Sequence, residues 1–253
     1  MPPSQRHFSA ASTGGMAEHH KGGRMRVDGI IFDKDGTLFD FRATWDVWAL
    51  GVITELSDGD PALARRIADA AVFDLEAQAF LPDSPIIAGT NREAAEAIGS
   101  ALPGRSIADL EAFLSARAAV APLAPAVPLD PFLTGLAARG LALGVITNDT
   151  EKGAVAHLTH AGVLGHFSFV AGFDSGHGAK PDPAPLLAFC TRTGLLPERV
   201  VMVGDSHHDL LAGRRAGMQT LGVLTGTALA DDLAPLADAV LPDIGHIPDW
   251  LLT

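Results

Sequence analysis

Four short apolar segments, each ending in polar residues, limit the folds open to this chain of 253 residues. They cover residues 27–33, 141–147, 199–205 and 219–225, and such uninterrupted apolar runs are typical of parallel strands buried on both faces. Helix signals lie beside them, from Asp130-Pro131 to Gly140, from Thr150 to Gly162 and from Asp182-Pro183 to Gly194. Strands that alternate with helices predict an α/β fold with a doubly wound parallel sheet, which binds ligands at the carboxyl ends of its strands.

Residues 40–126 interrupt this alternation and contain helix signals in succession. The first predicted helix has an apolar stripe that runs from Leu63 to Asp74. Three helix starts are indicated by capping residues, namely Asp60-Pro61, Thr90 with Glu93, and Ser106 with Asp109. We therefore expect a helical insertion over residues 40–126, with the α/β core formed by residues 25–39 and 127–253.

Composition and charge narrow the class of partner. A net charge of −12 without a dense run of Lys or Arg argues against nucleic acid. No run of about 18 apolar residues is present, so we expect no membrane span. The single cysteine, Cys190, excludes an internal disulfide and fits a reducing compartment, which predicts a cytoplasmic chain. Residues 1–24 lack periodicity and an apolar signal segment, and they are predicted to be a disordered tail.

Polar residues follow three of the predicted strands, and one more polar residue lies in a loop. They are Asp33 and Asp35 after the first strand, Thr147 and Asn148 after the second, Lys180 in a loop, and Asp205 with Asp209 after the third. If the sheet is parallel, these side chains converge on one edge. The sequence therefore predicts a single site at that edge.

Converging carboxylates favour a hard divalent cation, and Mg²⁺ suits a site that keeps positions open for water and phosphate. Asp33 and Asp205 are the expected carboxylate ligands, and the predicted core has no Cys or His cluster with zinc spacing. Of two neighbouring carboxylates, one can act as nucleophile while the other exchanges protons with the leaving group and with water. Lys180 and Thr147 would then bind oxygens of the transferred group, and the electrophile that suits this set is a phosphoryl group.

Four motifs resemble, in order, those of the haloacid dehalogenase superfamily, and in particular its phosphoglycolate phosphatase-like branch. They are "DKDGTL" from Asp33, "VITND" around Thr147, "KPDPAP" from Lys180 and "VGDSHHDLLAGRRAG" from Val203. The resemblance covers residues 27–245. It implies a Rossmann-like core, a helical cap over residues 40–126, and a Mg²⁺-dependent phosphoric monoester hydrolase that acts on a small phosphorylated metabolite, phosphoglycolate-like or a phosphosugar.

The resemblance also implies a role for each matched residue. Asp33 would be the nucleophile that becomes an aspartyl-phosphate, and Asp35 the general acid and base, with its backbone carbonyl on Mg²⁺. Thr147 and Asn148 would bind the phosphate, and Lys180 would bridge the nucleophile and the phosphate. Asp205 would complete the metal site, and Asp209 would orient Lys180 or metal-bound water.

Single residues help to distinguish between the other reactions known for this fold. Dehalogenases of the superfamily lack the acid at the position of Asp35, and a phosphonoacetaldehyde hydrolase needs a cap lysine, whereas no lysine lies between Lys34 and Lys152. A sugar phosphomutase stays open, because it uses the same aspartyl-phosphate. A non-catalytic binding module also stays open, although it has no need for the full set of site residues. The sequence does not distinguish a monomer from a homodimer.

Substrate choice is expected to depend on the helical insertion. Its cations available for a substrate carboxylate are Arg42, Arg65, Arg66, Arg92, Arg105 and Arg117. Trp45 and Trp48, three residues apart, are expected to pack on one helix face. We assign no role to His177, His207 or His208, because exposed loop histidines need none.

Overall fold

The computed structural model describes residues 26–252, so the tail predicted over residues 1–24 lies outside the described residues. Six parallel strands form the main sheet in the order β5-β4-β1-β6-β7-β8. Their bounds are β1 (Gly29–Phe32), β4 (Ala142–Ile146), β5 (Phe169–Ala171), β6 (Val200–Gly204), β7 (Gln219–Val223) and β8 (Ala239–Leu241). The four predicted strands are confirmed, whereas β5 and β8 were not predicted.

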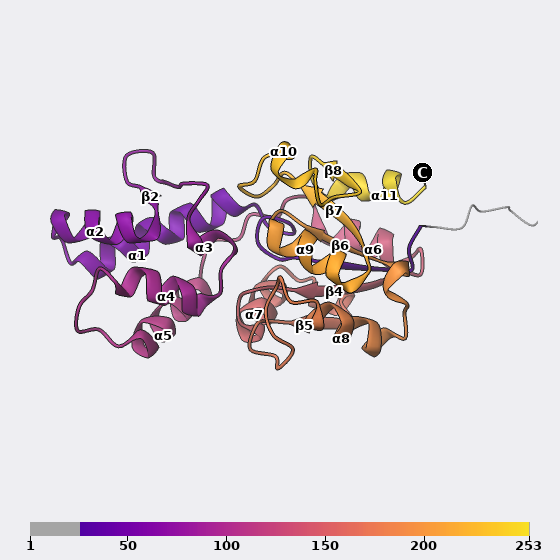
Figure 1. Ribbon diagram of the computed structural model, residues 1–253, viewed down its shortest axis with the longest axis horizontal. Helices are drawn as coiled ribbons and strands as arrows, with labels where there is room; N and C mark the ends of the chain where they lie inside the picture. Colours follow the sequence, from indigo (N-terminus) through magenta and orange to yellow (C-terminus); the bar gives the residue numbers. More distant parts are fainter. Residues whose placement is uncertain (1–25, 253) are drawn as a thin grey trace, which may run out of the picture.

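Helices cover both faces of this sheet, as expected for a doubly wound fold (Figure 1). They are α6 (Leu129–Ala137), α7 (Glu151–His160), α8 (Ala184–Thr193), α9 (His207–Ala216), α10 (Ala230–Leu233) and α11 (Ile247–Trp250). Short 3₁₀ turns join them at η2 (Leu164–His166), η3 (Pro197–Arg199) and η4 (Ile244–His246). The predicted starts of α7 and α8 are confirmed, since Thr150 caps α7 and the Asp182 carboxylate accepts from the backbone N–H of Ala184.

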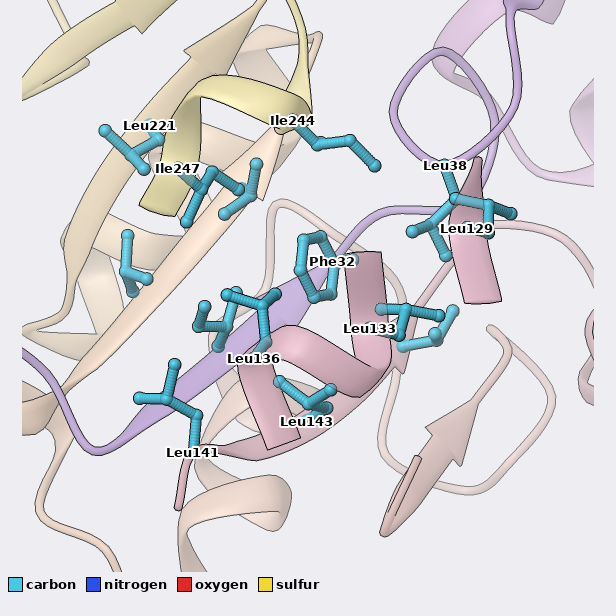
Figure 2. Close-up of a cluster of buried hydrophobic side chains, with 14 of the residues drawn as sticks. Phe32, Leu38, Leu129, Leu133, Leu136, Leu141, Leu143, Leu221, Ile244 and Ile247 are labelled. Carbon is cyan, nitrogen blue, oxygen red and sulfur yellow. The ribbon is translucent and has the colours of Figure 1, made fainter. Parts of the chain in front are cut away.

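Successive residues of β1 supply the two halves of the core, because side chains alternate across a strand. Phe32 packs with α6 and α11 side chains, including Leu133, Leu136 and Ile247, as Figure 2 shows. Ile31 faces the other way and packs with Phe189 of α8 and with side chains of α9. Both faces of the sheet are therefore dry, which explains why β1 reads as an uninterrupted apolar run.

The helical insertion lies between β1 and β4 and occupies the left of Figure 1. Its elements are η1 (Arg42–Asp46), a π-helical turn, α1 (Val47–Ser57), α2 (Pro61–Ala71), β2 (Phe73–Asp74), β3 (Ala79–Phe80), α3 (Pro85–Ala88), α4 (Asn91–Gly99) and α5 (Ile107–Ala118). It has its own apolar cluster, which includes Ile67, Ile98 and Leu110. The exact boundaries at residues 40 and 126 stay a prediction.

The three predicted helix starts of the insertion are confirmed. Asp60, Thr90 and Ser106 are the N-caps of α2, α4 and α5. The predicted stripe that ends at Asp74 is wrong at its end, because α2 stops at Ala71 and Asp74 belongs to the β2–β3 hairpin. Val72 ends the helix with a φ of 52°, in the left-handed region.

Within residues 26–252, no helix combines the length and the apolar character that crossing a membrane requires.

Replacing Leu133 with alanine tests the packing of α6 on the sheet. Leu133 is fully buried, so Leu133→Ala is expected to lower the free energy of unfolding by about 2–5 kcal/mol. Leu196→Ala is the matched control, since 61% of Leu196 is exposed and its loss should cost less than about 0.5 kcal/mol. Urea denaturation of both variants makes the comparison, and equal midpoints would contradict this account of the core.

Candidate active site

The order of the strands reverses around β1, which places the carboxyl ends of β4, β1 and β6 side by side. Asp33 follows β1 directly, and Lys180 reaches it from the loop after β5. The Lys180 Nζ lies 2.6 Å from Asp33 Oδ1 and 2.6 Å from Asp209 Oδ1. All three side chains are buried. The structure thus joins residues that lie 147 positions apart in the sequence.

Asn148 fixes the backbone of Lys180. Its Oδ1 accepts from the Lys180 N–H at 2.9 Å, and its Nδ2 donates to the Lys180 carbonyl at 3.0 Å. Thr147 Oγ1 accepts from the backbone N–H of Asp149 at 3.1 Å, which leaves the hydroxyl proton available for another acceptor. Both side chains line the cleft, and their predicted contacts with phosphate stay a prediction.

Asp33, Asp205 and Asp209 form an acidic cluster, in which one oxygen of each carboxylate lies within 4.8 Å of the others. Asp209 is already used, because its Oδ1 binds Lys180 and its Oδ2 accepts from the Ser206 hydroxyl at 2.6 Å. This leaves Asp33 and Asp205 as the carboxylates with capacity for a cation. A Cβ at Gly226 would lie 1.8 Å from Asp205 Oδ2, so the absence of a side chain there makes room for this carboxylate.

The cluster has more negative than positive charge. Burial raises the pKa of the Asp33 carboxyl to about 7, although the Lys180 ammonium lowers it. Burial also raises the pKa of Asp205, and the charges of Asp209 and Asp33 add to this effect. Burial alone would lower the pKa of Lys180, but the Asp209 and Asp33 carboxylates outweigh it and raise the value. Three carboxylates surround one ammonium, which leaves an excess of negative charge. Their oxygen atoms are ligands that suit a divalent cation such as Mg²⁺.

Asp35 points its carboxylate toward different partners from Asp33. Trp45 of η1 donates its indole N–H to Asp35 Oδ1 at 2.9 Å, and Lys34 Nζ lies 2.6 Å from Asp35 Oδ2. Lys34 is fully buried and lies 3.3 Å from Asp149 Oδ2, an ion-pair distance without hydrogen-bond geometry. Burial would lower the pKa of Lys34, but Asp35 and Asp149 raise it above its ordinary value.

His157 of α7 connects this pair to the helical insertion. Its Nδ1 lies 3.0 Å from Lys34 Nζ, and its Nε2 lies 2.8 Å from the carbonyl of Ala118 at the end of α5. An ammonium can only donate, so Nδ1 accepts and the ring proton is on Nε2. Burial lowers the pKa of His157, and the charge of Lys34 lowers it further. The neutral imidazole is therefore the form that this site holds.

A cleft with a volume of about 90 Å³ lies between the sheet edge and the helical insertion. The sheet side contributes Asp33, Asp35, Thr147, Asn148, Asp149, Lys180, Asp205, Ser206, His208 and Asp209. The insertion contributes Phe41, Trp45, Trp48, Phe80, Ile86, Ile87, Gly89, Thr90, Asn91, Ala94 and Ala118. Every residue predicted for the site lines this one cleft. Of the three histidines left without a role, His208 lines it, while His177 and His207 are exposed.

Comparison with known proteins places the chain in a family. The model of the haloacid dehalogenase-like hydrolases matches residues 27–217. The chain belongs to this family. A phosphoglycolate phosphatase of Rhodospirillum rubrum is 32% identical over 224 residues, which are 88% of this chain and 90% of that protein. One of Psychrobacter arcticus is 38% identical over 125 residues, which are 49% of this chain and 54% of that protein.

Most of these matches are partial, so the chain spans about half the length, or less, of several curated relatives. A crystal structure of a predicted phosphoglycolate phosphatase from Haemophilus somnus has a TM-score of 0.67 and 23% identity, and the match covers 90% of this chain and 99% of that one. At that identity the likeness concerns the fold. It agrees with the six-stranded sheet of a haloacid dehalogenase-like hydrolase.

Four residues around Asp35 belong to the site of this haloacid dehalogenase-like hydrolase but were not predicted from the sequence. They are Lys34, Trp45, Asp149 and His157. For Lys34 a signal existed, because a lysine between two aspartates at the end of a buried strand has no route to solvent. Trp45 was expected to pack on one helix face together with Trp48, and the two rings meet edge to face with centroids 5.3 Å apart. The pairing of His157 with Lys34 spans 123 positions and had no sequence signal.

The lowered pKa of His157 predicts a pH dependence of folding. Below its ordinary pKa of 6.5 the unfolded chain binds a proton at His157 that the folded chain excludes, so the contribution of His157 to the free energy of unfolding falls as the pH decreases through that region, whereas the raised pKa values of Asp33 and Asp205 act in the opposite direction. His157→Gln keeps a donor and an acceptor without the titrating ring. Urea denaturation should therefore show that lowering the pH from about 7 to about 5 changes the free energy of unfolding less favourably for the wild type than for the variant, and equal changes would contradict the assignment.

Proposed function

We propose that this haloacid dehalogenase-like hydrolase is a Mg²⁺-dependent phosphatase that hydrolyses a small phosphomonoester through an aspartyl-phosphate on Asp33. The observation that carries the proposal is the arrangement at the end of β1. Asp33 is paired with Lys180 at the floor of the cleft, and Asp35, two residues later, is held separately by Lys34 and Trp45. The phosphoglycolate phosphatase of Rhodospirillum rubrum, matched along nine-tenths of its length, supports the same class of reaction.

The two carboxylates divide the reaction between them. An oxygen of Asp33 forms a bond to phosphorus while the bond to the ester oxygen breaks, and Asp35, which enters this step in its protonated form, gives that proton to the departing alcohol. Asp35 then takes a proton from water, the resulting hydroxide attacks phosphorus, and Asp33 is released with inorganic phosphate. The proton balance closes because Asp35 gives one proton and recovers one.

Other side chains stabilise the group in transfer. Lys180 balances the charge on Asp33 and on the phosphoryl oxygens, and Asp209 holds the ammonium in place. The hydroxyl of Thr147 has a proton free for a phosphoryl oxygen. Asp33 and Asp205, with the backbone carbonyl of Asp35, would hold Mg²⁺, and the bound ion would neutralise charge on the phosphoryl group.

Asparagine substitutions separate the roles of the two carboxylates. Asp33→Asn is expected to lower kcat roughly 10³-fold or more on every ester, because the nucleophile is lost. Asp35→Asn should lower kcat roughly 10²- to 10⁴-fold on alkyl phosphates but much less on 4-nitrophenyl phosphate, whose leaving group needs no proton. Steady-state hydrolysis of both esters measures this, with Asp231→Asn, an exposed carboxylate of α10, as the control. Full activity of Asp33→Asn would sink the proposal.

Thermal unfolding tests the metal site apart from turnover. Mg²⁺ binds only the folded site, so it should raise the Tm of the wild type, with about 2.7 kcal/mol of added stability at a hundredfold excess over Kd. Asp205→Asn should lose this shift, whereas Asp231→Asn should keep it. Each protein is compared with itself without Mg²⁺, so a change in basal stability does not disturb the result. An undiminished shift in Asp205→Asn would exclude Asp205 as a ligand.

A further inference from the structure

The wall that the helical insertion contributes to the cleft is apolar and aromatic. Phe41, Trp45, Trp48 and Phe80 supply its rings, and Ile86 and Ile87 supply branched aliphatic side chains. The phosphate end of a substrate is assigned to the sheet edge by the proposed function, on which this inference rests. The organic group of the ester must therefore lie against the apolar wall.

The polar side chains of this wall are already used for the structure of the insertion. Thr90 caps α4, accepting from the Glu93 N–H and donating to Glu93 Oε2. Asn91 donates from Nδ2 to the carbonyl of Glu111 and to Ser115 Oγ at the neighbouring helix α5. The hydrogen-bond donors of both side chains are therefore occupied within the insertion and are not available to a substrate.

No arginine of the insertion faces the cleft. All six, Arg42, Arg65, Arg66, Arg92, Arg105 and Arg117, are exposed on its outer surface, and none lines the cleft. Two of them pair with carboxylates there, Arg92 with Glu96 and Arg117 with Glu55. The arginines considered from the sequence as partners of a substrate carboxylate are therefore in the wrong place.

The charges that do line the cleft would repel a second anion. Within the described part of the chain, Lys180 is the only lysine or arginine in the lining, and Asp33 and Asp209 already share it. The lining carboxylates number five, namely Asp33, Asp35, Asp149, Asp205 and Asp209. Lys34 neutralises Asp35 and Asp149 from behind and is itself buried away from the cleft. A carboxylate brought against the apolar wall would lose water and gain no lysine or arginine as a partner.

One donor in the wall has no partner. The indole N–H of Trp48 is buried and makes no hydrogen bond within the described residues, and Trp48 itself lines the cleft. The nitrogen itself is closed off by the surrounding side chains, so Trp48 presents only its ring carbons to a ligand in the cleft.

We infer that the substrate is a phosphomonoester whose organic group is uncharged and apolar or aromatic. Phosphoglycolate, whose organic group ends in a carboxylate, is disfavoured by the same wall. Family membership and substrate preference thus separate in this chain, because the sheet edge sets the reaction and the insertion sets the ester.

Non-hydrolysable phosphonates test this inference by binding alone. The ligands are phenylphosphonate, 4-carboxyphenylphosphonate and 4-carbamoylphenylphosphonate, titrated calorimetrically into the full chain with Mg²⁺. The carboxyl and carbamoyl ligands match in size and differ in charge. The carbamoyl ligand should bind at least about tenfold more tightly than the carboxyl ligand, because only the latter leaves an unpaired charge.

A designed cation provides the reverse test. Ile87→Lys places an ammonium in the wall, and Ile87→Met is the matched control of similar length without charge. The affinity for 4-carboxyphenylphosphonate should rise in Ile87→Lys relative to Ile87→Met, while the affinity for phenylphosphonate should not.

The outcomes separate this inference from the proposed function. Tighter binding of the carboxyl ligand by the wild type, or no binding of phenylphosphonate, would overturn the inference even if esters are hydrolysed with dependence on Asp33. Hydrolysis that survives Asp33→Asn would instead overturn the proposed function, whatever the phosphonates show.

Discussion

Placing two carboxylates side by side at the end of one strand is the constraint on which this active site depends. Asp33 and Asp35 are two residues apart where β1 opens into the cleft, one buried and one half-buried, and each receives its own ammonium, from Lys180 and from Lys34. A buried carboxylate without such a partner is strongly destabilising. The two ion pairs also connect distant segments, since Lys180 brings the loop after β5 to β1, and Lys34 reaches Ala118 of the insertion through His157. Charge balance therefore decides where the loops and the insertion sit.

Much of the fold follows from local signals in the sequence. The four strands buried on both faces are short, uninterrupted apolar runs, and their flanking helices begin at recognisable caps such as Thr150. The strands β5 and β8 were missed because each has three residues and is only partly buried, so neither forms a distinct apolar run. The β2–β3 hairpin, with two residues per strand, is too short to interrupt a helical pattern, and its Asp74 was read as part of α2.

The site was predictable where its residues follow strands, because parallel strands collect such residues at one edge. Asp33, Thr147 and Asp205 belong to this group. Lys34 and His157 did not follow from the pattern, since their roles arise from a contact between segments far apart in the chain. The direction of the arginine side chains was equally hidden, because helix propensity says which residues form α4 and α5 but not which face meets the sheet edge. Sequence thus indicated the chemistry better than it indicated the ester.

The burial of the two site lysines also affects how this protein responds to chemical labelling. Residues 26–252 contain three lysines, of which Lys152 is exposed while Lys34 and Lys180 are buried. An amine-reactive reagent applied to the folded chain therefore meets one accessible side chain in this region and leaves the centre of the cleft unmodified. Reaction at Lys34 or Lys180 requires the sheet edge to open. The extent of labelling at these two positions therefore measures how often the native state opens locally.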